Sequence, residues 1–494
     1  MCKFTLDTTK RIRLGIWGLG RGMTFYRSCE ALGIDVVAGC DYNAHMREAF
    51  LKQCPNAFVT ANHEEFLKQD MDAVLVATYS TEHCDDTILA LEAGKHVLAE
   101  VTSFHTMAQG VRLVEAVEKA GLVYQLAENY PFTKRNMFLA DQYEKGLFGE
   151  LQYAEFEYVH NCVTLAYTYI DGVPIAPGNT VHFWRSWVNF HYYNTHSLGP
   201  VMNITGLRPT RIVSLPCKPG VPGFLDTECQ QIAPSLINMS NGSIMRNFMG
   251  ATSSDVHTAR LWGTLGAAED TGQGLMLRLG GGISKAASLK LAIDPEWPQG
   301  FGELAEQTGH GGGDFWVLYY FAREIREGTA GPFSIYGAAA CTSAGILGYR
   351  SGVDHGQPYD IPNFANKDDR DIWRNDHFQQ KRYDVRKGCF PEDANPELTG
   401  KFSATMRDMI VHANTYLALS KWHQVVNSVR ECDREHIEKA RADYLAHLDE
   451  VQGIYKTARE IADAYPSSDG GVLLSDMLQI GGEPNVLAGS FTSF

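Results

Sequence analysis

The chain has 494 residues, of which 44% are hydrophobic and 20% charged, a composition typical of a globular protein with two or three domains. Its formal net charge of -15 argues against nucleic acid and anionic membranes as partners, because both attract clusters of lysine and arginine. The 11 cysteines are scattered and form no CxxC pair, which predicts reduced thiols in a cytoplasmic protein.

Strands and helices alternate through the first 130 residues. Apolar runs predict buried strands at 12–18, 34–41, 71–80, 95–101 and 122–129. Helices are predicted between them, at about 22–32, 44–53, 81–94 and 106–121. This alternation favours a parallel, doubly wound sheet, and we assign it to a domain that covers residues 1–130.

A different pattern begins at Phe148. Residues alternate with period two in four segments, 151–160, 210–217, 243–250 and 258–266. The alternation predicts an open, mostly antiparallel sheet in an α+β domain over residues 131–365, with helices at 313–328 and 336–351. From residue 366 to residue 494 the chain is charged and helical in pattern, which predicts a helical C-terminal extension. The fold class is therefore α/β with an α+β second domain. No apolar run is long enough to span a membrane.

A glycine-rich turn separates the first strand from the first helix. Gly18 and Gly20 form a G-x-G motif, and Gly22 stands beside Met23, which occupies the third glycine position of the usual dinucleotide fingerprint. Asp41 ends the second strand about twenty residues later, where an acid binds the ribose hydroxyls of NAD and repels the 2′-phosphate of NADP. The motif predicts NAD as the cofactor; the alternative is a glycine turn in a nucleotide-free α/β fold.

Polar side chains follow the predicted parallel strands at their carboxyl ends, where ligands of such sheets bind. Thr78, Glu100 and Asn129, together with Glu128, fall at these ends and are expected to line the cofactor crevice. Arg21 and His83 complete the predicted cofactor-binding set. Glu100 has a second interpretation, as a structural acid that accepts hydrogen bonds from loop amides.

These landmarks resemble the Gfo/Idh/MocA oxidoreductases over roughly residues 11–365. Most dehydrogenases of that family carry Glu-Lys-Pro at one strand end, and the lysine helps to bind the sugar and to move the proton of the oxidised hydroxyl. Here the triplet is Glu100-Val101-Thr102, so that lysine is absent. The oligomers of the family further imply a homo-oligomer.

Further stretches are similar to the NAD-dependent glycoside hydrolases of the α-N-acetylgalactosaminidase type, which also have Glu-Val at this strand end. They are "AENYPF" at 127–132, "YVH" at 158–160, "WR" at 184–185, "YNTHSLGP" at 193–200 and "HGGGDF" at 310–315. The chain departs from that type at Thr102, Asn194, Ser197 and Gly313. The resemblance implies a reaction in which NAD is not consumed. Carbon 3 of the sugar is oxidised, carbon 2 is deprotonated, the glycosidic oxygen is eliminated, water adds, and carbon 3 is reduced again.

That reaction requires an acceptor for the 3-hydroxyl proton and a base for carbon 2. Tyr158 and His160 lie two residues apart on a predicted strand and therefore share one face. Tyr158 is the candidate base, which His160 assists in binding or catalysis. Tyr193 and His196 lie three apart at the predicted start of a helix, and His196 is the candidate acceptor because a near-neutral imidazole exchanges protons reversibly.

The remaining candidates come from two segments. His310 precedes three glycines and is predicted to orient the sugar or water, with Asp314 as a substrate-binding residue. Trp184 is predicted to stack on the sugar, or alternatively to belong to the core. Arg185 is either a substrate clamp or a structural ion-pair partner, and the histidines could be hydrogen-bonded core residues. The His, Asp and Cys residues lack metal-ligand spacing, so no metal is predicted.

Three functions remain open from the sequence. The first is an NAD-dependent glycoside hydrolase that acts on a small carbohydrate or glycoside. The second is an NAD-dependent sugar or glycoside dehydrogenase in which His196 and Tyr193 replace the absent lysine. The third is a protein that binds NAD and a sugar without catalysis. The products distinguish them: aglycone without NADH, stoichiometric NADH, or neither.

Overall fold

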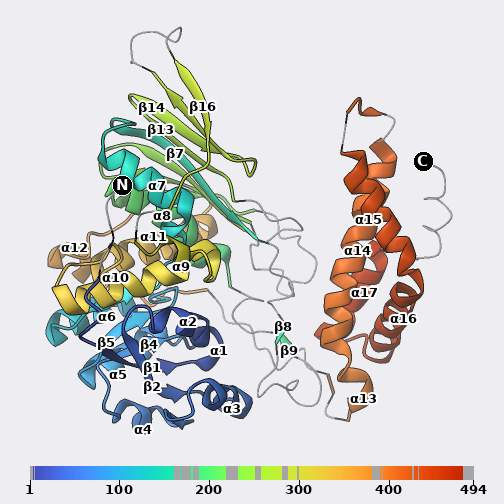
Figure 1. Ribbon diagram of the computed structural model, residues 1–494, viewed down its shortest axis with the longest axis horizontal. Coiled ribbons are helices and arrows are strands. Elements are labelled where there is room, and N and C mark those ends of the chain that lie inside the picture. Colours follow the sequence, from blue (N-terminus) through green and yellow to red (C-terminus); the bar gives the residue numbers. More distant parts are fainter. Residues whose placement is uncertain are drawn as a thin grey trace. The chain divides into compact units, whose positions relative to one another are not determined.

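The computed structural model describes most of the chain: residues 4, 6–160, 167–168, 180–181, 188–217, 232–250, 257–280, 288–297, 300–380, 390–391, 393–425, 428–431 and 433–481. The chain divides into two compact units (Figure 1). Unit 1 comprises Met1–His160, Asn189–Pro219 and Gln230–Lys381, and unit 2 comprises Asn161–Val188, Gly220–Cys229 and Arg382–Phe494. The division into three domains at residues 130 and 365 stays a prediction.

Unit 1 contains the predicted parallel sheet, which has six strands in the order β3-β2-β1-β4-β5-β6. The strands are β1 Ile12–Trp17, β2 Ile34–Cys40, β3 Phe58–Thr60, β4 Ala73–Val76, β5 His96–Ala99 and β6 Tyr124–Leu126. Every strand pair in this sheet is parallel, and all residues of β4 are buried. The strand order reverses between β1 and β4, which is where doubly wound sheets bind nucleotides. The predicted fold class is confirmed.

Three helices of this layer match their predicted positions, and local capping signals mark the ends of two of them. They are α3 Ala44–Gln53, α5 His83–Glu92 and α6 Met107–Ala120. Asn43 caps α3, Thr106 and Gln109 form a capping box on α6, and Gly121 ends α6 in a left-handed conformation. The helix predicted at 22–32 is different: helical turns begin directly after Gly18, as α1 Leu19–Gly22, η1 Met23–Phe25 and α2 Tyr26–Cys29. β3 and α4 His63–Leu67 are too short to give a clear periodic signal, and neither was predicted.

The second sheet of unit 1 has nine strands in the order β16-β15-β14-β13-β7-β12-β11-β10-β17. The strands are β7 Leu151–Val159, β10 Pro209–Ser214, β11 Ile232–Met239, β12 Ile244–Gly250, β13 Ala259–Gly263, β14 Gly266–Asp270, β15 Leu275–Leu279, β16 Leu289–Ile293 and β17 Tyr359–Asp360. Among the described strands of this sheet only β7 and β12 pair in parallel, so the prediction of a mostly antiparallel sheet is confirmed. β11 was not predicted, because Pro234 interrupts its alternating pattern.

Helices connect the two sheets of unit 1. They are α7 Lys134–Glu144, α8 Thr195–Thr205, α9 Gly302–Ala305, α10 Gly313–Glu327, α11 Ile335–Val353 and α12 Lys367–Asp371, with short 3-10 turns η2 Tyr130–Phe132, η4 Phe190–Tyr193 and η6 His310–Gly312. α11 contacts β6 of the first sheet and β10 of the second. A Cβ on Gly345 would lie 2.3 Å from the carbonyl oxygen of His191, so η4 lies directly on α11 and fixes where α8 begins.

His191 is a fully buried histidine whose ring nitrogens lie 3.0 Å from Asn189 Oδ1 and 2.9 Å from Ser214 Oγ. Burial lowers its pKa to about 4, although the Pro234 carbonyl opposes the shift. Its stabilising contribution is therefore complete above the ordinary histidine pKa of about 6.5 and declines as the pH falls towards 4.

We expect the free energy of unfolding to fall by about 1.4 kcal/mol per pH unit across this window through His191 alone. Urea titrations of the wild type and of His191→Gln at pH 7, 5.5 and 4.5 measure this. The variant should have the lower stability at pH 7 and the shallower pH dependence. Equal slopes in the two proteins would show that His191 takes up no proton on unfolding in this range.

Unit 2 is mainly helical where the structure describes it. Its helices are α13 Pro396–Thr399, α14 Phe402–Val425, α15 Arg434–Ala446, α16 Leu448–Ala464 and α17 Asp469–Gly481, and the strands β8 Tyr167–Thr168 and β9 Thr180–Val181 pair with each other. α14 contacts α15, α16 and α17. The predicted helical C-terminal region is thus confirmed. Among the described helices of the chain, none has the length and apolar character needed to cross a membrane.

Candidate functional site

The predicted cofactor turn requires glycine at its first position. Gly18 has a φ of +96°, and a Cβ there would lie 2.2 Å from the carbonyl oxygen of Ala77. Gly20 is different, because a Cβ there would meet no heavy atom within 4 Å. The backbone of Gly20 is therefore open to a ligand, as expected of the second glycine in a dinucleotide turn.

Gly22 performs the task of the third glycine of the fingerprint, although it stands one position early. A Cβ on Gly22 would lie 2.4 Å from Cγ2 of Ile16 in β1, so glycine lets the helical turns pack closely on the sheet. The imperfect spacing of the motif, with Met23 in the third position, therefore leaves its packing function intact.

Two alanine substitutions should separate cofactor binding from packing. We expect Gly22→Ala to lower the free energy of unfolding by about 1–3 kcal/mol because of the clash with Ile16. Gly20→Ala should leave unfolding unchanged and weaken NAD binding by roughly tenfold or more, because the methyl group stands where the pyrophosphate approaches. Chemical denaturation measures the free energy of unfolding of both variants, and NAD titration measures their affinity for the cofactor. Destabilisation by Gly20→Ala together with weaker NAD binding by Gly22→Ala alone would contradict the roles assigned to the two glycines.

Asp41 follows β2 and is tied to the glycine turn. Its Oδ2 accepts a hydrogen bond of 2.7 Å from the backbone N–H of Leu19, and its Oδ1 accepts one of 2.8 Å from that of Asn43. The carboxylate is therefore held beside the turn, where an acid binds the ribose of NAD. The open backbone at Gly20 and this carboxylate fit the NAD that the motif predicts.

Thr78 follows β4, and His83 is the first residue of α5. The Thr78 hydroxyl donates a hydrogen bond of 2.6 Å to Asp86. The ring nitrogens of His83 lie 3.0 Å from the carbonyl oxygen of Thr78 and 2.9 Å from that of Thr102. His83 thus holds together the two segments that follow β4 and β5, and these segments border the crevice.

A network of charged residues joins the first β–α turn to α10. Arg21 Nε donates to Glu100 Oε1 over 2.7 Å, and Arg21 Nη2 donates to Asp314 Oδ1 over 2.8 Å. Burial alone would raise the pKa of Asp314, but hydrogen bonds from Arg21 and His310 hold it well below its ordinary value. Glu100 also accepts a hydrogen bond from the N–H of Val101, as its structural interpretation requires.

His310 is fixed by the same network. Its Nδ1 lies 3.0 Å from Asp314 Oδ2, and Asn129 Nδ2 donates to Asp314 Oδ1 over 2.9 Å. His310 has a φ of +54°, an uncommon conformation for a residue other than glycine, and its side chain is 41% exposed. The side chain of Asp314, by contrast, is 0% exposed. Asp314 thus holds Nδ1 of the accessible His310 imidazole in place and leaves its Nε2 for other interactions.

A second histidine–carboxylate pair lies in the interior. His196 Nδ1 is 2.8 Å from Glu128 Oε1 and 2.9 Å from Oε2, and both side chains are buried. Tyr130 donates its backbone N–H to Glu128 Oε1 over 3.1 Å. A Cβ on Gly199 would lie 3.1 Å from Cγ of Glu128, so α8 approaches the carboxylate closely. Glu128 thereby orients the imidazole and leaves Nε2 for proton exchange.

The structure brings together Tyr158, His160, Tyr193 and His196. The His196 ring centroid lies 4.8 Å from that of Tyr158 and 4.5 Å from that of Tyr193, and Tyr158 lies 5.6 Å from His160. These side chains come from β7 and its end, from η4 and from α8. The predicted candidates for proton transfer therefore form one aromatic cluster, and Trp184 and Arg185 lie outside the described residues.

Three residues of this cluster were not in the predicted site set. Tyr130 lies 4.6 Å from His196 and His257 lies 5.0 Å from Tyr158, measured between ring centroids. Glu128, the partner of His196, was expected only to line the crevice. The position of Glu128 and Tyr130 at the end of a predicted strand was a usable signal, whereas His257 stands just before β13 with no motif around it.

The two histidine–carboxylate pairs are neighbours. Glu128 and Asn129 are adjacent in the chain, and Asn129 bonds to Asp314. Burial alone would lower the pKa of Arg21, but the charges of Glu100 and Asp314 and the nearby Tyr193 raise it. Oδ1 of Asn129 is buried with no hydrogen-bond partner among the described residues, so it can accept a hydrogen bond from a ligand.

Two family models match the chain. An oxidoreductase family with an NAD-binding Rossmann fold, the Gfo/Idh/MocA family, matches residues 12–128, and the C-terminal domain of glycosyl hydrolase 109 matches residues 293–370. A glycosyl hydrolase family 109 protein of Shewanella sp. (strain MR-4) is 26% identical over 406 residues, which cover 74% of this chain and 86% of that protein. A protein with the same family name from Saccharopolyspora erythraea is 24% identical over 428 residues, covering 76% and 87% respectively.

Solved structures share the fold. Levoglucosan dehydrogenase in complex with NADH and levoglucosan has a TM-score of 0.60 at 16% identity and covers 72% of this chain and 100% of its own. An inositol dehydrogenase homolog from Azotobacter vinelandii, in complex with NADH and myo-inositol, has a TM-score of 0.56 at 17% identity and covers 73% and 100%. Residues 12–128 thus match the NAD-binding Rossmann fold of the Gfo/Idh/MocA oxidoreductase family, and residues 293–370 match the C-terminal domain of glycosyl hydrolase family 109.

Proposed function

We propose that the protein is an NAD-dependent glycoside hydrolase that works by transient oxidation of the sugar at carbon 3. The family matches support the coarser statement that it is an NAD-dependent enzyme acting on sugars. One observation carries the finer proposal: Tyr158 lies against the buried His196–Glu128 pair, while Val101 occupies the place of the usual dehydrogenase lysine. Two proton-transfer groups are therefore clustered where a simple dehydrogenase needs one.

The first task of the protein is to take the proton of the 3-hydroxyl. NAD, when bound, supplies the hydride acceptor and later the hydride donor for carbon 3. His196 accepts the hydroxyl proton through Nε2, because its Nδ1 is hydrogen-bonded to Glu128. The buried carboxylate stabilises the imidazolium that forms, as in other histidine–carboxylate pairs. The ketone at carbon 3 then acidifies the proton on carbon 2.

Tyr158 removes the carbon-2 proton. A tyrosine hydroxyl is a weak base at its ordinary pKa of about 10 and needs a neighbouring positive charge. The imidazolium formed at His196, with its ring centroid 4.8 Å from that of Tyr158, favours loss of the Tyr158 hydroxyl proton to water, and the resulting tyrosinate takes the carbon-2 proton. Tyr193 borders the same ring of His196 and restricts its position. The first proton transfer thus prepares the second.

His310 serves the leaving group and the water. Its Nδ1 is held by Asp314, so Nε2 can donate a proton to the departing glycosidic oxygen and take one from the incoming water. Asp314 acts through His310 and Arg21 as a positioning residue. We propose His160, Trp184 and Arg185 as sugar-binding residues. Water addition and return of the hydride complete hydrolysis without net change in NAD.

The second candidate is an NAD-dependent sugar dehydrogenase, because the His196–Glu128 pair alone can carry out the oxidation step. One experiment distinguishes the two functions. The purified protein is incubated with NAD and a panel of aryl glycosides, and both the aglycone and the absorbance of NADH are followed. Aglycone release without net NADH supports the hydrolase, and NADH equal to the sugar consumed would replace it with the dehydrogenase. If NAD binds and neither product forms across the panel, the protein is a non-catalytic sugar-binding protein.

A further inference from the structure

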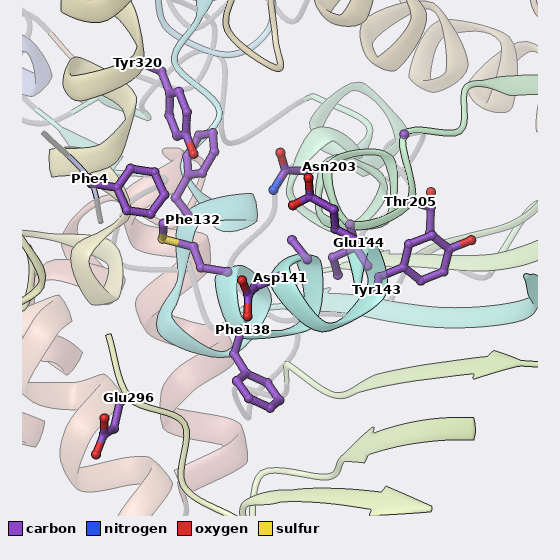
Figure 2. A pocket seen from close by; sticks show the side chains of 14 residues that line it. Phe4, Phe132, Phe138, Asp141, Tyr143, Glu144, Asn203, Thr205, Glu296 and Tyr320 are labelled. Atoms are coloured by element: carbon purple, nitrogen blue, oxygen red, sulfur yellow. The ribbon is translucent and has the colours of Figure 1, made fainter. Parts of the chain in front are cut away.

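A cavity of about 550 Å³ lies in unit 1, apart from the two histidine–carboxylate pairs (Figure 2). None of the residues of those pairs lines it. It shares supporting elements with the site, however. α8 carries His196 in its first turn and presents Asn203 to the cavity near its end, while α10 carries Asp314 in its first turn and presents Tyr320 to the cavity. A ligand here would therefore bind at a second, separate place on unit 1.

Aromatic side chains form much of the cavity wall. Phe4, Phe132, Phe138, Tyr143 and Tyr320 all line it. Figure 2 shows Phe4, Phe132 and Tyr320 gathered at one side, and the ring centroids of Phe132 and Tyr320 are 4.9 Å apart. Burial raises the pKa of Tyr320 to about 12, with Arg323 opposing, so its hydroxyl remains neutral at physiological pH. This wall offers π faces and a neutral hydroxyl.

The polar part of the lining is acidic. It contains the carboxylates of Asp141, Glu144 and Glu296, and no lysine or arginine. Lys145 Nζ lies 2.5 Å from Asp141 Oδ2 and largely neutralises that carboxylate. Within the described part of the chain, Glu144 and Glu296 have no ion-pair partner, and both side chains are exposed. The cavity therefore carries a net negative charge, in keeping with the formal net charge of -15 for the whole chain.

We propose that this cavity binds a small organic cation: a primary or secondary amine attached to an apolar ring body. Aromatic faces attract cations through their quadrupole, and carboxylates accept hydrogen bonds from an ammonium group. The volume lies within the range of small-molecule sites. An anion is repelled by Glu144 and Glu296, and a neutral ligand of the same shape gains neither the ion pair nor the cation–π contact.

The test is isothermal titration of the full-length protein with three probes of similar shape: phenethylamine, 2-phenylethanol and phenylacetate. We expect phenethylamine to bind at least about tenfold more tightly than the alcohol, and phenylacetate not to bind. The double variant Glu144→Gln/Glu296→Gln should lose roughly tenfold in affinity for the amine. Phe138→Leu should weaken it as well, because one ring face is lost. Glu150→Gln, an exposed acid on the segment after α7 that does not line the cavity, is the matched control and should bind like the wild type.

Four results would overturn the proposal. Three of them are equal affinity for the amine and the alcohol, absence of binding by any probe, and equal loss in the Glu150→Gln control. A concentration-dependent dimer that dissociates in Phe138→Leu would also overturn it, since the cavity would then belong to an interface. These binding measurements need neither NAD nor a glycoside, so their outcome is independent of the proposed function.

Discussion

Replacing Tyr158 with phenylalanine should lower aglycone release by roughly 10²- to 10⁴-fold while leaving the oxidation step in place. The substitution removes one hydroxyl and keeps the ring against His196. His196 can still take the 3-hydroxyl proton, so carbon 3 is oxidised, but the carbon-2 proton has no base. We therefore expect NADH to appear in a single turnover, up to one per active site, and then to stay. Stopped-flow absorbance of NADH, with the aglycone followed in parallel, measures this.

The matched control is Tyr153→Phe on the same strand, β7. Tyr153 and Tyr158 are five residues apart and so lie on opposite faces of the sheet, and the Tyr153 hydroxyl bonds to Glu155. This variant should turn over like the wild type. Undiminished aglycone release by Tyr158→Phe would remove Tyr158 from the mechanism, and loss of both NADH and aglycone would show that Tyr158 is needed before carbon 2 is deprotonated.

His196→Asn should abolish both signals. Without the imidazole, the 3-hydroxyl proton has no acceptor, so neither the single-turnover NADH nor the aglycone appears, and turnover falls by roughly 10³-fold or more. Glu128→Gln should cost less, roughly 10- to 10³-fold, because the imidazole remains but loses the carboxylate that orients it and stabilises its charge. NAD affinity should be unchanged in His196→Asn, because His196 is not among the residues assigned to the cofactor.

The double variant Glu128→Gln/His196→Asn tests whether the two residues act as a unit. If Glu128 acts only through His196, the double variant should be no slower than His196→Asn alone. Multiplicative losses would show instead that Glu128 contributes separately, for example by binding the sugar. Circular dichroism melts of all three variants serve as the folding control, since Glu128 is completely buried.

Features set by local spacing were predictable from the sequence. The glycine turn with Gly18 and Gly20 and the caps of α3 and α6 each depend on residues within a few positions of one another, and the acid at Asp41 follows the turn at the usual spacing of about twenty residues. The alternation in β7 placed Tyr158 and His160 on one face for the same reason. Short elements such as β3 and α4 were not predicted, because three to five residues contain less than two periods of a helix or strand pattern.

Contacts between distant parts of the chain were not predictable. Glu128 and His196 are 68 positions apart, and Arg21 and Asp314 are 293 apart, so no spacing rule connects them. Gly22 illustrates a different limit: its role depends on how close Ile16 lies in the folded sheet, and counting positions assigned that role to Met23. The sequence suggested the chemical types present, and packing decided which side chains became partners.

Deuterium incorporation at carbon 2 tests the central claim most directly. The enzyme hydrolyses an aryl glycoside in D₂O with NAD present, and the released sugar is analysed by NMR. The proposed elimination exchanges the carbon-2 proton with solvent through Tyr158, whereas carbon 3 regains its own hydride. The account therefore predicts deuterium at carbon 2, protium at carbon 3 and no net NADH. Hydrolysis that leaves protium at carbon 2 would contradict it.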